Sequence, residues 1–366
     1  MSRFEPRRPP RTTEVGFMQR YRLVLAGLLA AAAAAIACGD GSTPSGDDDD
    51  DMTAPDAGGG EPDATPPPPG SYTLEWGPYT VAPGEEDTRC VVLRLGNRES
   101  LRVHQIHNVL GPVSHHFIVY RSNETEERRE PFQCDPFVGT LNAETSPLMI
   151  TQRFDETLTL PDGVAFVLEP NQMIRLELHY INATDAPVEA RPTSTFIPLA
   201  DGDFTDAADL VFMGDVDIDI PPMSTASIED TYLSLPSELS GAQFFAITGH
   251  EHQWGTNVRV HTASGPGAPV AAVYDVPNFD WDEPDTVFHS PPFTVPDGGG
   301  FLLSCEWNNR SDQRVRFGES ANDEMCFFWA YYYPSVGPRI CFQTDQTGSP
   351  LSVCCPGSPL CSALGF

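Results

Sequence analysis

The chain has 366 residues and a formal net charge of −31, from 52 acidic and 21 basic residues. That length allows two domains of ordinary size. The acidic balance excludes nucleic acid as a partner and gives the folded part no attraction to anionic lipid.

The N-terminal residues 1–70 predict a targeting segment followed by a tether. An apolar run of 15 residues, Leu23–Ala37, is too short to span a bilayer comfortably and has the form of a signal peptide. It ends in Ala35-Ile-Ala-Cys38, which resembles the lipobox at which bacteria acylate a cysteine; the alternative is an ordinary signal peptide that ends near a cysteine. We therefore predict a lipoprotein signal peptide over 1–37, then a lipidated Cys38 and a disordered acidic, Pro- and Gly-rich linker over 38–70.

The cysteines indicate export to an oxidising compartment. With Cys38 assigned to the lipid, an even number remains, and an even count in an exported chain suggests disulfides whose pairing the sequence leaves open. These are Cys90, Cys134, Cys305, Cys326, Cys341, Cys354, Cys355 and Cys361.

From residue 71 onward the chain predicts an all-β fold. Short apolar or alternating runs, such as Met173–Tyr180 and Cys326–Tyr333, are separated by Pro, Gly, Asp and Asn, a pattern typical of sandwiches and jelly rolls. The acidic segment 201–209 marks a boundary between two halves. We expect an N-terminal β-sandwich domain over 71–200, a C-terminal one over 201–345 and a Cys-rich tail over 346–366.

Five of the nine histidines fall into three small groups. His250 and His252 are two residues apart, so on a strand both would project from one face and could reach one metal ion. His115 and His116 are adjacent and can bind one ion only at a bulge, a strand end or a strong twist. His179 lies in an alternating strand, where a lone histidine is more often structural than a ligand.

Met325 makes copper the favoured metal for these residues. It lies in Asp323-Glu-Met-Cys326, directly before a dense aromatic run. Methionine usually fills a core. A thioether is nonetheless a soft ligand suited to Cu(I), which harder cations ignore.

Taken together, these elements resemble the copper type II, ascorbate-dependent monooxygenases, the group of peptidylglycine α-hydroxylating monooxygenase and dopamine β-monooxygenase. The resemblance runs with gaps from about residue 87 to 334, and its elements follow the family order. They are Asp87-Thr-Arg-Cys90, Ser114–Ile118, Leu178–Tyr180, His250–His252 with Gly255, and Gly318 through Asp323–Cys326 to Tyr332–Pro334.

The resemblance implies two jelly-roll domains that face a solvent cleft and hold two copper ions. By position, His115, His116 and His179 look like the ligands of the first ion, and His250, His252 and Met325 look like those of the second, where oxygen chemistry takes place. Cys305 and Cys326 resemble a family disulfide beside the methionine, and Cys90 and Cys134 are a second candidate pair. The implied reaction hydroxylates a C–H bond of a small-molecule substrate with O2 and a reductant such as ascorbate.

Three positions depart from the peptide-amidating members, in which an Asn, a Tyr and an Arg hold the substrate carboxylate. Here they are Phe327, Trp329 and Thr248, so peptide amidation is not expected. The replacements fit a neutral or apolar substrate and fit core packing equally well.

The leading hypothesis is a copper-dependent monooxygenase on the bacterial cell envelope, at the outer membrane or cell surface, which contacts the membrane through its lipid anchor only. The alternative from another class is a non-catalytic copper-binding envelope lipoprotein. A weaker option is a scaffold in which the histidines bind zinc.

Overall fold

The structure, a computed structural model, describes residues 67–134, 145–200, 202–318, 320, 322–345, 351–356 and 361. The expected signal peptide, Cys38 and most of the expected linker lie outside the described residues. Among the helices that the structure describes, none is long and apolar enough to cross a lipid bilayer.

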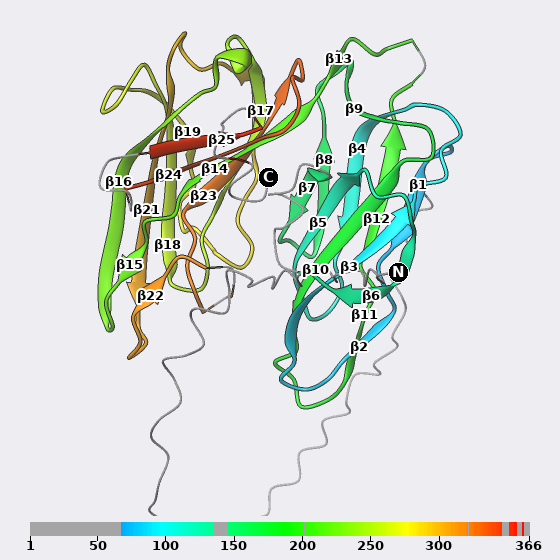
Figure 1. Ribbon diagram of the computed structural model, residues 1–366, viewed down its shortest axis with the longest axis horizontal. Helices are drawn as coiled ribbons and strands as arrows, with labels where there is room; N and C mark the ends of the chain where they lie inside the picture. Colours follow the sequence, from blue (N-terminus) through cyan, green and yellow to red (C-terminus); the bar gives the residue numbers. More distant parts are fainter. Residues whose placement is uncertain are drawn as a thin grey trace, which may run out of the picture. The chain divides into compact units, whose positions relative to one another are not determined.

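The predicted all-β fold is confirmed. Apart from the short 3-10 helix η2 (Ser237–Leu239), the elements from Tyr72 to Cys355 are strands, which form two successive groups of sheets (Figure 1).

Two main sheets are built from the first half of the folded chain. One has the order β1 (Tyr72–Glu75), β12 (Thr193–Pro198), β4 (Leu101–Val109), β9 (Val164–Leu168), β13 (Asp206–Ala207), with β8 (Asp155–Thr159) paired to β4. The other has the order β6 (Arg128–Gln133), β3 (Glu86–Arg94), β10 (Met173–Ile181), β5 (Ser114–Ser122), β7 (Thr145–Thr151). A two-stranded ribbon joins β2 (Tyr79–Val81) to β11 (Val188–Ala190).

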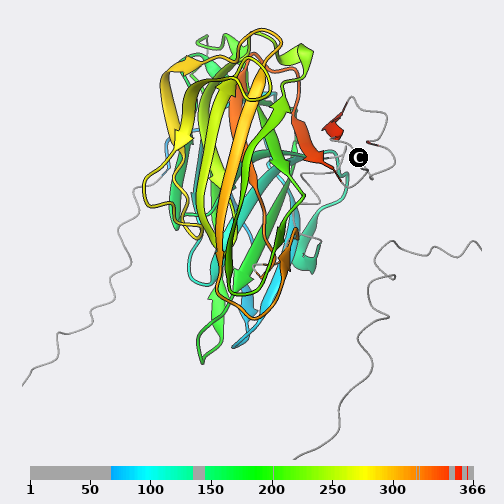
Figure 2. The ribbon, with the colours of Figure 1, turned by 90° about the vertical axis from the view of Figure 1, so that its left-hand side faces the viewer.

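The second half repeats this plan, and Figure 2 views it from its outer side. One sheet has the order β20 (Val287–Phe293), β17 (Gln243–His250), β23 (Phe327–Tyr333), β14 (Asp209–Asp215), β24 (Arg339–Thr344), β25 (Leu351–Cys355). The other has the order β16 (Ser224–Ser234), β21 (Gly300–Asn309), β18 (Gly255–Ala263), β19 (Pro269–Asp275). A short pair consists of β15 (Asp219–Ile220) and β22 (Val315–Arg316).

The sequence explains which strands lie at the centre. In β10 the alternation of leucine with Glu177 and His179 puts apolar side chains on one face and polar ones on the other, and both faces are buried. The aromatic strand β23 is buried almost throughout and pairs with β17 on one side and β14 on the other. Strands covered on both faces bury the most apolar surface, so they form the core of each half.

Strand pairing passes from the first half to the second within three residues. Ala207, in β13, pairs with β9 of the first half, whereas Asp209 begins β14 of the second. One hydrophobic cluster nevertheless includes residues of both halves: Phe166 of β9 and Tyr331 of β23 belong to it, with ring centroids 6.3 Å apart. The two halves therefore share part of their core.

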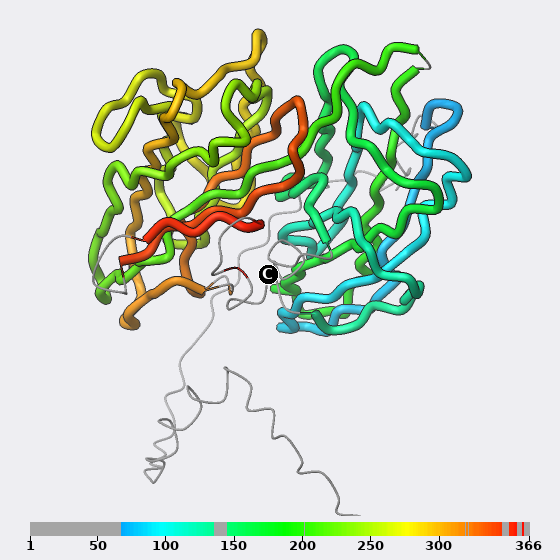
Figure 3. Tube along the Cα trace, turned by 45° about the horizontal axis from the view of Figure 1, so that its top comes forward, coloured from blue at the N-terminus to red at the C-terminus, as the bar shows by residue number. Residues whose placement is uncertain are grey.

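Four disulfides join the described cysteines. Cys305–Cys326, which the resemblance implied, and Cys90–Cys134, the second candidate pair, are both formed. Two further bonds, Cys341–Cys354 and Cys355–Cys361, tie down residues placed in the Cys-rich tail. In that tail, residues 351–355 form β25, the edge strand of a sheet of the second half, seen in red in Figure 3.

Candidate metal centres

Strands β5 and β10 bring His115, His116 and His179 together. His116 lies opposite His179, but the next pair along the strands is Ser114 with Tyr180, so His115 is an extra residue in a β-bulge. The bulge turns two adjacent histidines toward one point, one of the geometries that their sequence requires. One ligand atom from each histidine lies within 4.8 Å of the others.

Carboxylates approach two of these three histidines. Oε1 of Glu86, at the start of β3, lies 3.2 Å from Nε2 of His179. Oδ1 of Asp282, in the second half of the chain, lies 3.4 Å from Nε2 of His115. The neighbouring ring of Trp281 lies against His115, with centroids 5.3 Å apart. A segment of the second half thus contacts a cluster that belongs to the first.

His250 and His252 form the second cluster at the end of β17. The strand ends at His250 itself, so the two histidines do not share a regular strand as the spacing suggested. Their rings still meet, with centroids 5.1 Å apart. Between them, the Glu251 side chain turns inward, and its carboxylate accepts hydrogen bonds from the backbone of Asn257 at 3.2 Å and Glu306 at 3.1 Å.

A second buried carboxylate connects this cluster to Met325. Glu324 precedes Met325, and its Oε2 accepts the backbone N–H of His252 at 2.9 Å and that of Met325 at 3.2 Å. Its Oε1 accepts the N–H of Trp254 at 2.7 Å. The His-x-His segment and the methionine, far apart in sequence, are therefore held by the same side chain.

Residues 207–350 match the family model of the copper type II ascorbate-dependent monooxygenase, C-terminal domain. The matched residues contain His250, His252 and Met325. This part of the chain is similar to that family's C-terminal domain. The resemblance seen in the sequence is thereby confirmed. His115, His116 and His179 lie before the matched residues.

Two solved viral structures show a weak likeness to the fold. The major capsid protein P2 of bacteriophage PM2 aligns with a TM-score of 0.31 and 10% identity, over 72% of this chain and 97% of that one. A structure of the infectious bursal disease virus Gt strain aligns with a TM-score of 0.19 and 10% identity, over 72% and 70% of the two chains. Both scores are too low to bear on function.

The donor atoms of both clusters fit copper. All five histidines are buried, with at most 7% of their surface exposed. Burial lowers the pKa of His115 to about 3, with His179 and His252 adding to the effect, and lowers that of His252 to about 4. Burial also holds the pKa values of His116 and His250 well below the ordinary value. Neutral imidazoles with a buried thioether form a donor set suited to copper.

The two buried carboxylates next to His250, His252 and Met325 have pKa values that are raised. Burial raises the pKa of Glu324 to about 7, against its hydrogen bonds to N–H donors. Burial, with Glu324 nearby, holds the pKa of Glu251 well above its ordinary value. A β-carbon on Gly255 would meet the carboxylate of Glu251 at 2.5 Å, which explains a glycine at this point of the motif.

The three positions that depart from the peptide-amidating members lie on neighbouring strands. Thr248 pairs with Trp329 and His250 pairs with Phe327 across β17 and β23. Both aromatic rings are buried and stack on Phe212 of β14. They pack in the hydrophobic cluster that includes residues of both halves, which agrees with the core-packing interpretation of these residues.

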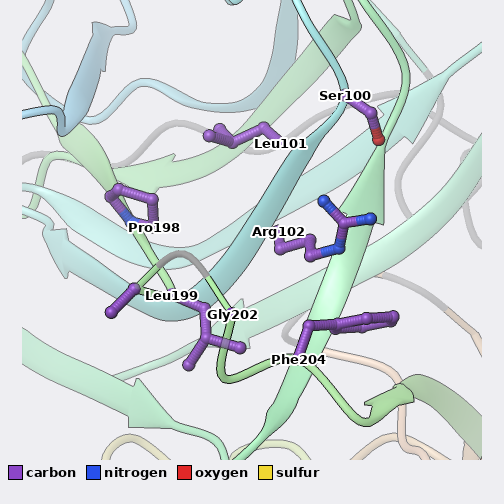
Figure 4. A pocket seen from close by; sticks show the side chains of 8 residues that line it. Ser100, Leu101, Arg102, Pro198, Leu199, Gly202 and Phe204 are labelled. Atoms are coloured by element: carbon purple, nitrogen blue, oxygen red, sulfur yellow. The ribbon is translucent and has the colours of Figure 1, made fainter.

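The remaining histidines lie outside both clusters. His104 and His289 contact backbone carbonyl oxygens, at 3.1 Å and 2.9 Å, and His107 contacts Asp155 at 2.9 Å on the surface. His261 lies in β18. A cavity of about 370 Å³, lined by Arg102, Leu199 and Phe204 among others, is also separate, because none of its lining residues is a histidine of either cluster (Figure 4).

Several residues that contact the clusters had no role assigned from the sequence. Glu324 lies in the Asp-Glu-Met-Cys motif, so its place beside Met325 was a usable signal. No motif with a candidate ligand marks the others, because tertiary structure alone brings them to the histidines. These are Glu86, Gln152, Trp281 and Asp282.

Proposed function

We propose that this chain is a copper-dependent monooxygenase that binds one copper ion at His115, His116 and His179 and another at His250, His252 and Met325. The observation that carries the proposal is the buried cluster of His115, His116 and His179, whose ligand atoms lie within 4.8 Å of one another. His250, His252 and Met325 are also buried, and Glu324 accepts backbone hydrogen bonds from His252 and Met325. The family match to residues 207–350 supports the second set and the dependence on copper and ascorbate.

The two ligand sets differ in which oxidation state of copper they favour. Bound copper supplies one-electron redox chemistry and reaction with dioxygen. Three imidazoles bind either oxidation state, whereas the softer thioether of Met325 favours the reduced one. The protein buries both sets, lowers the pKa values of His115, His116, His250 and His252 and holds the backbone of Met325 through Glu324, which limits side reactions with water.

We propose a neutral or apolar substrate for the second site. Phe317 has 40% of its surface exposed and lies 5.9 Å, between ring centroids, from Phe327, which pairs with His250. Phe317 and Glu324, the residue before Met325, form an isolated parallel β-bridge. An exposed aromatic ring beside the second ligand set offers contact area to an apolar C–H donor.

Oxygen uptake in the presence of ascorbate and added copper tests this function. We expect copper-dependent uptake that rises with a suitable C–H donor and yields a hydroxylated product. Two bound copper ions without turnover of any neutral or apolar donor would instead favour the non-catalytic copper-binding lipoprotein. Phe317→Ala should raise KM for an apolar donor and leave copper content unchanged, and Val336→Ala, at another exposed apolar position, is the control.

We also propose that the protein is attached to the bacterial envelope through a lipid on Cys38. The proposal rests on the apolar run and lipobox-like sequence that end at this cysteine. Cys38→Ser should release the protein from isolated membranes into the soluble fraction. Retention of the Cys38→Ser protein in the membrane fraction would count against the anchor.

A further inference from the structure

Gln152 contacts His250 of the second cluster directly, and it reaches the first cluster through Trp281. It follows β7 directly and is buried, with 6% of its surface exposed. Its Oε1 lies 2.9 Å from Nδ1 of His250, and its Nε2 lies 3.2 Å from the backbone oxygen of Trp281. This single side chain of the first half therefore makes two hydrogen bonds to the second half.

The contact with Trp281 fixes which way the amide points. A backbone carbonyl can only accept a hydrogen bond, so the amide group that faces Trp281 must be the NH2. The amide oxygen then faces His250, and an amide oxygen can only accept. Nδ1 of His250 must therefore carry the proton, which leaves Nε2 as the nitrogen with a lone pair for a metal.

The NH2 end of the Gln152 amide is connected to the first cluster through Trp281. Trp281, held by Gln152, lies against the ring of His115, and Asp282 next to it contacts Nε2 of that histidine at 3.4 Å. The same segment is tied to the first half twice more. Arg153 pairs with Asp285, and Oγ1 of Thr286 donates to Oε1 of Glu156 at 2.8 Å.

We propose that Gln152 is a positioning residue for both metal sites. Its oxygen holds His250 in the Nδ1–H tautomer, and its NH2 group holds Trp281 over His115. The consequence for metal binding rests on the proposed copper function, whereas the tautomer is a property of the metal-free protein. Outer hydrogen-bond partners of this kind typically alter metal affinity by about 10- to 100-fold.

Two substitutions separate the roles of the two ends of the amide. Gln152→Glu keeps an acceptor for His250 and loses the donor to Trp281. Gln152→Leu loses both hydrogen bonds at similar volume. Gln105→Leu is the matched control, because the Gln105 amide donates to Oγ1 of Thr159 on the neighbouring strand β8, away from both clusters.

Nitrogen-15 NMR of the histidines in the full-length, metal-free protein tests the tautomer. We expect the Nδ1–H form for His250 in the wild type, in Gln152→Glu and in Gln105→Leu, and its loss in Gln152→Leu. The Nε2–H form in the wild type, or an unchanged His250 signal in Gln152→Leu, would overturn the proposal whether or not the protein binds copper.

Copper titration followed by electron paramagnetic resonance tests the link to both sites. We expect Gln152→Leu to weaken the site at His250 by about 10-fold or more and to change the spectrum of both sites. Gln152→Glu should change only the spectrum of the site at His115. Two bound copper ions with spectra identical in all variants would overturn the positioning role. Absence of copper from the wild type would overturn that role together with the proposed function, and the NMR result would still decide the tautomer.

Discussion

The indole Nε1 of Trp307 donates a hydrogen bond of 3.0 Å to Oε2 of Glu324, a carboxylate with no exposed surface. The backbone N–H groups of His252, Trp254 and Met325 donate to the same carboxylate. A buried carboxylate with four donors fixes the segments that supply them, because each donor would be left without a partner if it moved.

Glu324→Ala should therefore destabilise the protein and disturb the second ligand set. Loss of the acceptor leaves buried N–H groups unsatisfied, at a cost of about 1–3 kcal/mol for each group that water cannot reach. We expect the free energy of unfolding in urea to fall by about 3 kcal/mol or more, with weaker copper binding at His250, His252 and Met325. Glu283→Gln, which removes an exposed carboxylate, is the control. Equal stability of the two variants would contradict this role.

Met325→Ile should weaken one copper site and leave the other intact. The substitution removes the soft sulfur ligand and keeps an apolar side chain of similar size in the core. Metal analysis after dialysis should then show about one copper per chain in place of about two. Met213→Ile, at a buried position in β14, should keep both. Equal loss at both sites, or at neither, would rule out the proposed division of the ligands.

Removal of the Cys305–Cys326 bond should affect stability and the second site together. The bond joins residues 21 apart in sequence, and Cys326 follows Met325 directly. Replacing both cysteines by alanine should cost about 3 kcal/mol in the chain-entropy account and loosen Met325. The matched control removes Cys355–Cys361, whose residues are 6 apart. This control should cost about 2 kcal/mol and leave copper affinity unchanged. Unchanged copper affinity in both double variants would contradict a link to Met325.

Copper binding at about pH 6 should release few protons. A histidine with its ordinary pKa is mostly protonated at that pH and must lose its proton to bind metal. Burial holds the pKa of His115 at about 3 and that of His252 at about 4, so both are already neutral. Calorimetry in two buffers of different ionisation enthalpy should give less than about one proton per copper ion. Release of about two or more would show that the histidines are charged before binding.

The same shifts predict how the metal-free protein responds to acid. The pKa of His115 is lower in the folded chain than in the unfolded chain, so the unfolded chain binds more protons between about pH 6.5 and pH 3. The contribution of His115 to stability is complete above that window and is lost as the pH falls through it. His115→Asn should therefore flatten the decline in unfolding free energy from pH 7 to pH 5, and His107→Asn, on the surface, should not. Parallel pH profiles for the two variants would contradict the shift.

The sequence by itself determined the all-β fold and indicated the candidate metal ligands. Alternation in segments such as Met173–Tyr180 encodes strands locally, because a strand presents every second side chain to one face. The family resemblance also paired Cys305 with Cys326, and Cys90 with Cys134 was a second candidate pair. These features depend on residue type and short spacing, which are visible without coordinates.

Only the tertiary structure decided how the ligands meet and what holds them. The bulge at His115 depends on the register of β5 against β10, and the strand end at His250 depends on where Glu251 is buried. Gln152 reaches His250 from 98 positions away in the chain, and no local pattern marks it. Hydrogen bonds at such separations follow from packing of whole strands, so their partners are fixed by the fold and not by the neighbouring residues.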